Sequence, residues 1–294
     1  MELRRGRLVG WERLMGWWQL RRLQRWRRRI LLWWRRWLVT PDITSPANPH
    51  IRSLAQLKRR RGRDGAQRFL IEGTRELSRA VGAGTTIEEV ILSPDLASEE
   101  TSSLATAAPG RIRTVSEAPF AKLSVRQNPD GIIGVARTWT PGLEAIDRQL
   151  VLVAEGIEKP GNLGAMLRTA DAAGAAVVVA DPTVDLFNPN VVRASQGALF
   201  TVQLGVTDSA TALGWAADRG AVYVTTPTGE TPLWGADLRG PVSVVIGSEH
   251  AGVDAAWLDV GAPLRIPMAG ESDSLNASVA AAIVLFEAVR QREL

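Results

Sequence analysis

Two runs of branched apolar residues, each ending in glycine and polar residues, restrict the fold more than anything else in this sequence. Residues 151–156 read as a buried strand that continues into the glycine-rich loop 158–164 and a predicted helix over 165–173. Residues 242–246 read as a second strand, followed by Gly247, Ser248 and Glu249. Such strands are typical of parallel sheets covered on both faces, which bind ligands beyond the carboxyl ends of their strands. The pattern predicts an α/β fold with a ligand crevice near Glu249.

The glycine-rich loop does not match the common nucleotide-binding loops. It lacks the Gly-Lys-Ser/Thr end of a Walker loop, and its spacing is a poor match to the dinucleotide fingerprint. We therefore expect its glycines to let another backbone pass close by.

A third segment, 272–280, places four small polar side chains before an apolar helix predicted over 279–290. The free N–H groups of a first helical turn can meet a polar ligand group. The same residues also suit plain helix capping, by Ser274 or Asn276. Both interpretations stay open on these residues alone.

Taken in chain order, these segments resemble the three motifs of the SpoU (TrmH-like) RNA ribose methyltransferases. The first is Asn162 with Arg168, the second is 247–249, and the third joins 266–268 to 274–278. The resemblance spans about residues 150–292. It implies a SPOUT-type parallel sheet whose C-terminal segment forms a trefoil knot, a topology that general folding rules would exclude. It also implies S-adenosylmethionine as the cofactor.

The resemblance assigns roles to individual residues. The residues implied to bind the cofactor are Thr225, Gly247, Ile266, Met268, Ser274 and Leu275, with backbone near Thr226. The residues implied to be catalytic are Arg168, Asn162, Glu249 and Asn276, with Ser278 helping to position the hydroxyl.

Arg168 and Glu249 can also be judged from their chemistry. A guanidinium holds its proton too tightly to act readily as a base, so we favour electrostatic stabilisation of the reacting oxygen by Arg168 over a general-base role. Glu249 ends a buried strand and needs a partner there, and we expect Asn162 or Arg168 to supply it.

The amino-acid composition excludes several kinds of site and reaction. The chain has no cysteine and only two histidines, His50 and His250. Disulfides, cysteine zinc sites and methylation routes that need a thiolate nucleophile are thereby excluded. We predict no metal site, and direct methyl transfer to an oxygen needs none.

Upstream, a basic run suggests contact with RNA. Residues 50–79 hold nine basic residues against three acidic ones, and a phosphate backbone is a natural partner for such a run. The turn at 126–131 and the run 184–198 also resemble family segments, with Asn190 and Ser195 as further candidates for RNA or dimer contacts. The alternative for the second run is a helix started by Asn188 and Pro189. The predicted RNA-binding residues are Arg52, Lys58, Arg59, Arg60, Arg61, Arg63, Gln127 and Arg193.

These patterns divide the chain of 294 residues into four parts. We predict an extension over 1–43, a small α/β substrate-binding head over 44–136, a polar linker over 137–149 and a methyltransferase domain over 150–294. The head resembles the RNA-binding domain that ribosomal-RNA members of the family carry.

The extension is unlike the rest of the sequence. Residues 1–40 contain seven of the eleven tryptophans and twelve arginines against two glutamates. Their charge of +10, subtracted from +4 for the whole chain, leaves −6 elsewhere. Two explanations stay open: an amphipathic cationic helix for RNA or for peripheral contact with anionic lipid, or a gene start placed too far upstream. No stretch predicts a membrane span or a secretory signal.

We therefore predict a cytoplasmic, homodimeric, S-adenosylmethionine-dependent 2′-O-methyltransferase that acts on ribosomal RNA. The alternatives are a transfer-RNA methyltransferase, an antibiotic-resistance methyltransferase for ribosomal RNA, and a non-enzymatic RNA-binding or assembly factor of the same fold.

Overall fold

A computed structural model describes residues 40–293, and residues 43–294 form one compact unit. The predictions made for residues 1–39 lie outside the described residues. The first part of the unit, which we call the head, has these elements: α2 (Pro49–Gln56), α3 (Arg60–Ala66), β1 (Arg68–Glu72), α4 (Thr74–Gly82), β2 (Ile87–Leu92), α5 (Glu99–Ala107), β3 (Arg111–Thr114), α6 (Glu117–Leu123) and β4 (Ile132–Arg137).

The second part, which we call the C-terminal region, follows a short 3₁₀ turn, η1 (Leu143–Ala145), in the predicted linker. Its strands are β5 (Leu150–Glu155), β6 (Ala176–Ala180), β7 (Leu204–Thr207), β8 (Ala221–Thr225), β9 (Thr231–Pro232), β10 (Val242–Ile246) and β11 (Ala262–Arg265). Its helices are α7 (Pro160–Ala173), α8 (Pro189–Ser195), η2 (Ala198–Phe200), α9 (Ser209–Ala217), η3 (Leu233–Gly235), α10 (Ala255–Val260) and α11 (Ala277–Glu293).

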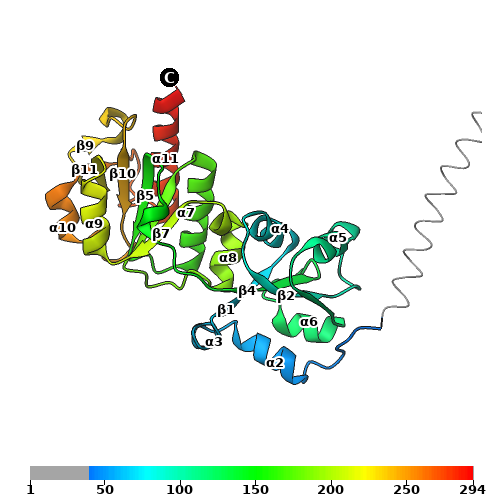
Figure 1. The fold of residues 1–294 in the computed structure, drawn as a ribbon. Coiled ribbons are helices and arrows are strands. Elements are labelled where there is room, and N and C mark those ends of the chain that lie inside the picture. Colours follow the sequence, from blue (N-terminus) through cyan, green and yellow to red (C-terminus); the bar gives the residue numbers. More distant parts are fainter. Residues whose placement is uncertain (1–39, 294) are drawn as a thin grey trace, which may run out of the picture. The chain divides into compact units, whose positions relative to one another are not determined.

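The C-terminal region is built on one seven-stranded parallel sheet of order β7-β6-β5-β10-β8-β11-β9 (Figure 1). The two strands expected from their apolar runs, β5 and β10, pair with each other near its middle. Every residue of both strands is buried. The predicted parallel α/β sheet is therefore confirmed.

The head has its own four-stranded sheet of order β1-β4-β2-β3. Strand β4 is antiparallel to β1 and β2, whereas β2 and β3 are parallel. The strands and the helix expected from the sequence, near 69–73, 74–81, 87–92 and 131–136, all lie within about one residue of the observed elements.

Helix α7 begins earlier than predicted. The sequence suggested a loop up to Gly164, but α7 starts at Pro160, with Lys159 as its N-cap residue. Proline has no backbone N–H to lose and a φ suited to the first helical turn, so it starts the helix here. Gly164 then lies inside the helix, and a Cβ there would come within 2.5 Å of the Ala194 Cβ. As expected, this glycine lets another segment, α8, pass close by.

Helix α11 also departs from the prediction, because it is buried on one side only. Its buried residues include Ala281, Val284 and Leu285. Val279 and Phe286 are 46% and 50% exposed, although the sequence had suggested that the helix is buried almost all round. The exposed side of α11 therefore carries apolar side chains that the rest of the described chain does not cover.

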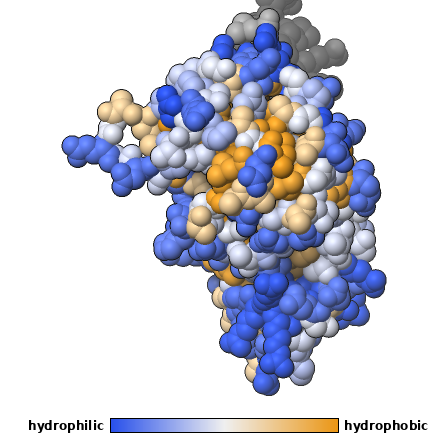
Figure 2. Space-filling model, turned by 90° about the vertical axis from the view of Figure 1, so that its left-hand side faces the viewer, coloured by the Kyte–Doolittle hydropathy of each residue, from blue (hydrophilic) through white to orange (hydrophobic). Residues whose placement is uncertain are grey.

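Other large apolar side chains are also open to solvent. Those that are at least about a third exposed in residues 40–293 are Ile112, Trp139, Trp234, Leu258, Val260, Met268, Val279 and Phe286. Figure 2, which views the molecule from the side where α9 and α10 lie, shows hydrophobic residues gathered in one area within a mostly hydrophilic surface. Contiguous apolar areas of this kind often mark interaction sites.

The head and the C-terminal region are joined by an aromatic cluster. Phe69 of β1 lies 4.6 Å from Phe187, measured between ring centroids, and Trp139 of the linker lies 4.7 Å from Phe187. Beside this cluster, Arg63 of α3 is ion-paired with Asp185. Within residues 40–293, no helix is long and apolar enough to span a membrane.

Candidate functional site

A cavity of about 660 Å³ opens at the carboxyl ends of β8, β10 and β11, where the sequence predicted a ligand crevice. We call it the strand-end cavity. Residues that line it include all six predicted to bind a cofactor: Thr225, Gly247, Ile266, Met268, Ser274 and Leu275. Thr225 is the last residue of β8, and the segments after β10 and β11 supply the other five.

Gly247 lines this cavity where the backbone of a neighbouring segment comes very close. A Cβ built on Gly247 would lie 2.1 Å from the Gly252 carbonyl oxygen, closer than any van der Waals contact. The turn is closed by Ser248 and Gly252, whose backbone groups exchange two hydrogen bonds. Only glycine fits here without moving the turn that shapes the cavity wall.

Beside the cavity, Glu249 is the centre of a polar network. Its carboxylate accepts hydrogen bonds from the side chains of Lys159 and Asn162. It also accepts one from Asn276 Nδ2 at 3.0 Å, and the same Nδ2 lies 3.2 Å from Asn162 Oδ1. Three of the four residues predicted to be catalytic are thus brought together from three segments.

Lys159 was missed by the sequence reasoning, although it lies in the glycine-rich loop that was singled out. Its ammonium and, to a lesser degree, the Asn162 amide hold the pKa of Glu249 below its usual value of 4.5. The carboxylate is therefore charged at neutral pH and fixes both amides in one orientation. The expectation that Glu249 would pair with Asn162 is confirmed, whereas no contact with Arg168 is found.

Asn276 combines capping with its place in the network. Its Oδ1 accepts hydrogen bonds from Ser278 N at 3.0 Å and Ser278 Oγ at 2.7 Å, so it caps the start of α11. Its Nδ2 is left for Glu249 and Asn162. Ser274, the other capping candidate, lines the cavity. Helix capping is therefore confirmed for Asn276, and its place in the cavity lining is compatible with the ligand-binding interpretation, which stays a prediction.

Arg168 stands apart from this network. It lies on α7 one and a half turns beyond Asn162, is exposed, and does not line the strand-end cavity. Its side chain makes no hydrogen bond or ion pair with residues 40–293. The described part of the chain also holds no group of three acidic or histidine side chains that could bind a metal.

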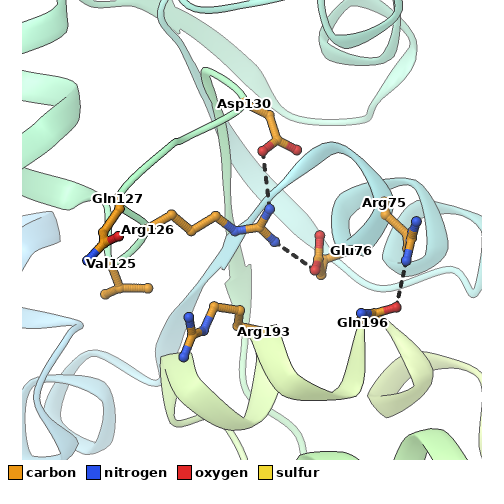
Figure 3. A pocket seen from close by; sticks show the side chains of 8 residues that line it. All are labelled: Arg75, Glu76, Val125, Arg126, Gln127, Asp130, Arg193 and Gln196. Carbon is orange, nitrogen blue, oxygen red and sulfur yellow. Dashed lines mark hydrogen bonds and ion pairs between the residues drawn. The ribbon is translucent and has the colours of Figure 1, made fainter.

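A second cavity, of about 730 Å³, lies between the head and the C-terminal region. We call it the junction cavity; Figure 3 shows the side chains that line it. Two of the residues predicted to bind RNA, Gln127 of the head and Arg193 of α8, face it together. Arg75, Arg126 and Gln196 also line it, and the sequence reasoning did not select them.

The other predicted RNA contacts differ in availability. Arg52, Arg59, Arg60 and Arg61 are exposed on α2, α3 and the turn between them. Lys58 is half-buried, and its Nζ donates to the carbonyls of Lys122 and Ser124.

For Arg63 the prediction was wrong. Its side chain is 2% exposed, is ion-paired with Asp185, and donates to the Leu57 carbonyl at 2.8 Å. Ser195 is likewise fully buried and cannot contact RNA. Asn188 and Pro189 instead start α8, as the structural alternative predicted.

Comparison with known proteins agrees with this geometry. Residues 149–286 match the SpoU rRNA Methylase family, and residues 48–134 match the MRM3-like substrate binding domain. The 23S rRNA (guanosine(2553)-2′-O)-methyltransferase RlmP of Bacillus subtilis is 31% identical over 264 residues, which cover 83% of this chain and 98% of that protein. The chain belongs to the SpoU family.

Solved SpoU-type structures support the assignment. A crystal structure of an RNA 2′-O ribose methyltransferase has 45% identity and a TM-score of 0.74, covering 86% of this chain and 99% of that one. The AdoMet-bound rRNA methyltransferase of Sinorhizobium meliloti has 29% identity and a TM-score of 0.76, covering 84% of this chain and 97% of that one.

The strand-end cavity of this SpoU protein suits S-adenosylmethionine in size and lining. Ligand pockets commonly enclose about 300–1,000 Å³, with apolar walls and a few fixed polar groups. Leu264, Ile266 and Leu275 provide apolar wall, and the loops after β8 and β10 provide backbone groups.

Proposed function

We propose that this chain transfers a methyl group from S-adenosylmethionine to a ribose 2′-hydroxyl of ribosomal RNA. The observation that carries the proposal is the Glu249 network beside a cavity lined by all six predicted cofactor residues. The names of the relatives, which include a 23S rRNA 2′-O-methyltransferase, favour ribosomal RNA as the substrate.

When bound, the cofactor supplies an electrophilic methyl group on a sulfonium. The protein must hold the ribose hydroxyl in line with that methyl and stabilise charge as the oxygen loses its proton. We propose that the Asn162 and Asn276 amides, which Glu249 holds in place, position the ribose. Glu249 acts through these amides and is a positioning residue.

Arg168 is proposed to stabilise the reacting oxygen or to orient a neighbouring phosphate. Its fork of N–H donors suits both tasks, and its exposed position leaves those donors for the RNA. Because Arg168 does not line the cavity of its own chain, we propose that the working enzyme is a homodimer in which the two subunits complete the site.

The open face of α11 supports the dimer. Val279 and Phe286 expose apolar area on a helix whose opposite face packs in the core. We expect Phe286→Asp to yield monomers in sedimentation velocity, while Ile112→Asp on the head leaves the oligomeric state of the wild type. A wild-type protein that sediments as a monomer at all concentrations would contradict the proposal.

We also propose that the C-terminal segment forms the trefoil knot that the family resemblance implies. Its support is the strand order, in which β8 lies between β10 and β11, and the loop at 226–229, which is held against β11. In that loop Thr226 N donates to Leu264 O at 2.9 Å, and Arg265 Nη1 donates to Gly229 O at 2.8 Å. An experimental trace of residues 225–277 tests the threading.

The test of the reaction is transfer of labelled methyl from S-adenosylmethionine to total RNA, with products mapped as alkali-resistant 2′-O-methyl linkages. We expect label at one ribosomal nucleotide, lost in Arg168→Ala and kept in Arg148→Ala, an exposed arginine just before the amino end of β5, whereas the network lies at the carboxyl ends of the strands. Label in transfer RNA instead of ribosomal RNA would show that transfer RNA is the substrate. Cofactor binding without transfer to any RNA would favour a non-enzymatic RNA-binding protein. The proposed substrate places the enzyme in the cytoplasm.

A further inference from the structure

The junction cavity brings together charged and amide side chains from both parts of the molecule. The head contributes Arg75 from α4 and the turn 125–130, and the C-terminal region contributes Arg193 and Gln196 from the end of α8. These groups are not equivalent, because some are already held by hydrogen bonds and others are free. That difference decides what the cavity can bind.

Arg126 is the fixed part of the cavity. Its guanidinium is ion-paired with Glu76 at 2.7 Å and Asp130 at 3.1 Å, as Figure 3 shows. It also donates to the Glu72 carbonyl at 3.0 Å. Two carboxylates thus neutralise this arginine, and its role is to hold the turn 125–130 against β1 and α4.

The same turn is anchored a second time. The Glu72 carboxylate accepts hydrogen bonds from Val125 N at 2.8 Å and from the hydroxyl of Ser124. Asp130 in turn accepts from Thr74 N at 3.0 Å. The wall that carries Gln127 is therefore preformed, which lowers the ordering cost of binding.

The side chains of Arg193 and Gln127, by contrast, are exposed and make no hydrogen bond or ion pair with the described residues. Figure 3 shows the Arg193 side chain rising from α8 towards the side of the cavity where Val125 and Gln127 lie. Arg75 is held nearby by Gln196, whose Oε1 accepts from Arg75 Nη1 at 2.6 Å. Gln196 has a left-handed backbone with a φ of 51°, uncommon for this residue type, and it ends α8 there.

We propose that the junction cavity holds one unpaired nucleotide of the substrate RNA. A backbone phosphate is bound by Arg193 and Arg75, and the free amide of Gln127 bonds to the edge of the base. The proposal rests on the proposed function, since it treats RNA as the substrate. Its new content is a specific anchor that bridges the head and the C-terminal region, away from the strand-end cavity.

Three observations favour a single unpaired nucleotide over duplex RNA or a peptide. The cavity, at about 730 Å³, has the size of a pocket for one small group, whereas duplex RNA is recognised mainly by shape across a wide groove. Its free donors are a guanidinium and an amide, the groups that read phosphate and base edges. Its lining has one apolar side chain, Val125, and so lacks the anchor that a peptide would need.

The test compares Arg193→Ala and Gln127→Ala with wild type, using the full chain and a ribosomal RNA fragment that wild type methylates. Arg111→Ala is the matched control, an exposed arginine on the far edge strand of the head sheet, β3. We expect Arg193→Ala to weaken RNA binding about fivefold to tenfold and to lower the slope of log affinity against log salt by about 0.7. Gln127→Ala should change the preference among fragments that differ in one unpaired base. Affinity for S-adenosylmethionine, measured by calorimetry, should stay unchanged in all three.

The outcomes separate this inference from the proposed function. If wild type methylates RNA but Arg193→Ala and Gln127→Ala bind it as Arg111→Ala does, the junction cavity is not an RNA site and the enzyme assignment stands. If wild type transfers methyl to no RNA, the proposed function fails. Equal melting temperatures for all variants exclude loss of fold as the cause. A photocrosslink from position 127 to a ribosomal protein instead of RNA would also overturn the inference.

Discussion

The strand-end cavity and the junction cavity are similar in volume but are assembled in different ways. The first is formed at the strand ends of one sheet, and its lining combines apolar side chains and glycines with polar side chains. The second is formed by two parts of the chain, and nearly all of its lining is charged or amide side chains. A partly apolar cofactor suits the first kind of site, whereas a flexible polyanion suits the second.

Arginine has two different roles in this protein. Arg63 and Arg126 are bound by carboxylates and hold segments together, whereas Arg168 and Arg193 are free. A count of positive charge along the sequence treats all four alike. Four experiments test whether the two cavities differ in this way.

The largest effect is expected when the centre of the polar network is removed. Glu249→Ala leaves Lys159, Asn162 and Asn276 without their shared acceptor, and we expect methyl transfer to fall by about 10²-fold, the size seen when one preorganised polar group is lost. The matched control is Glu230→Ala, an exposed carboxylate on the loop before β9. Initial rates at saturating RNA and cofactor measure the effect. Equal rates in the two variants would remove the network from the mechanism.

The second experiment addresses the support of the junction cavity. Arg63→Ala leaves the nearly buried Asp185 without its ion-pair partner. Breaking a buried ion pair lowers the free energy of unfolding by about 3 kcal/mol or more. Arg61→Ala, two residues away and exposed, should leave the unfolding free energy within about 0.5 kcal/mol of wild type. Urea denaturation measures both. If Arg63→Ala instead weakened RNA binding and left the unfolding free energy unchanged, the prediction that Arg63 contacts RNA would be supported.

The third experiment probes the shape of the strand-end cavity. Gly247→Ala forces a methyl group against the Gly252 carbonyl, so the turn must move, and we expect affinity for S-adenosylmethionine to fall about tenfold or more. Gly240→Ala is the control, because a Cβ there meets nothing within 4 Å. Calorimetric titration measures the cofactor affinity of the two variants. Their affinity for RNA should change little. Unchanged cofactor affinity in Gly247→Ala would show that the turn is not part of the cofactor wall.

The smallest effect is the pH dependence of the polar network. Lys159 lowers the pKa of Glu249 below 4.5, so the folded state favours the charged carboxylate. Its contribution is complete above 4.5, the pKa expected in the unfolded chain, and is lost as pH falls through the lower folded value. The melting temperature of wild type should therefore decline more than that of Glu249→Gln below pH 4.5, and the two should run parallel between pH 5 and 8. A divergence above pH 5 would contradict the direction of the pKa shift.

The sequence predicted the strand-end cavity well because its residues lie in short motifs. Strand ends and the turns that follow them are local features, so the residues alone predicted a crevice near Glu249. The cofactor residues Thr225, Gly247 and Leu275 were assigned through the family resemblance, and the structure places all three along one cavity. The start of α7 was misplaced because its glycines suggested a loop, although Pro160 was the better indicator of a helix start.

The junction cavity could be predicted only in part, since it depends on how two parts of the chain pack. Gln127 and Arg193 were selected from separate motifs, but nothing in the sequence places them beside Arg75 and Gln196. The partner of Arg63 lies 122 residues further along the chain. Charge patterns show how many cations a segment has, and only tertiary contacts show which of them are already bound.

The strand order also has a consequence for how the protein is made. Strand β5 pairs with the central strand β10, so the C-terminal sheet cannot close until residues up to 246 have left the ribosome. The head sheet needs nothing beyond residue 137. Since domains emerge and fold from the N-terminal side, the head can be complete while the large sheet still waits for its middle strand. We therefore expect the long-range pair of β5 and β10 to form more slowly than the head sheet, because contacts between distant parts of the sequence form later.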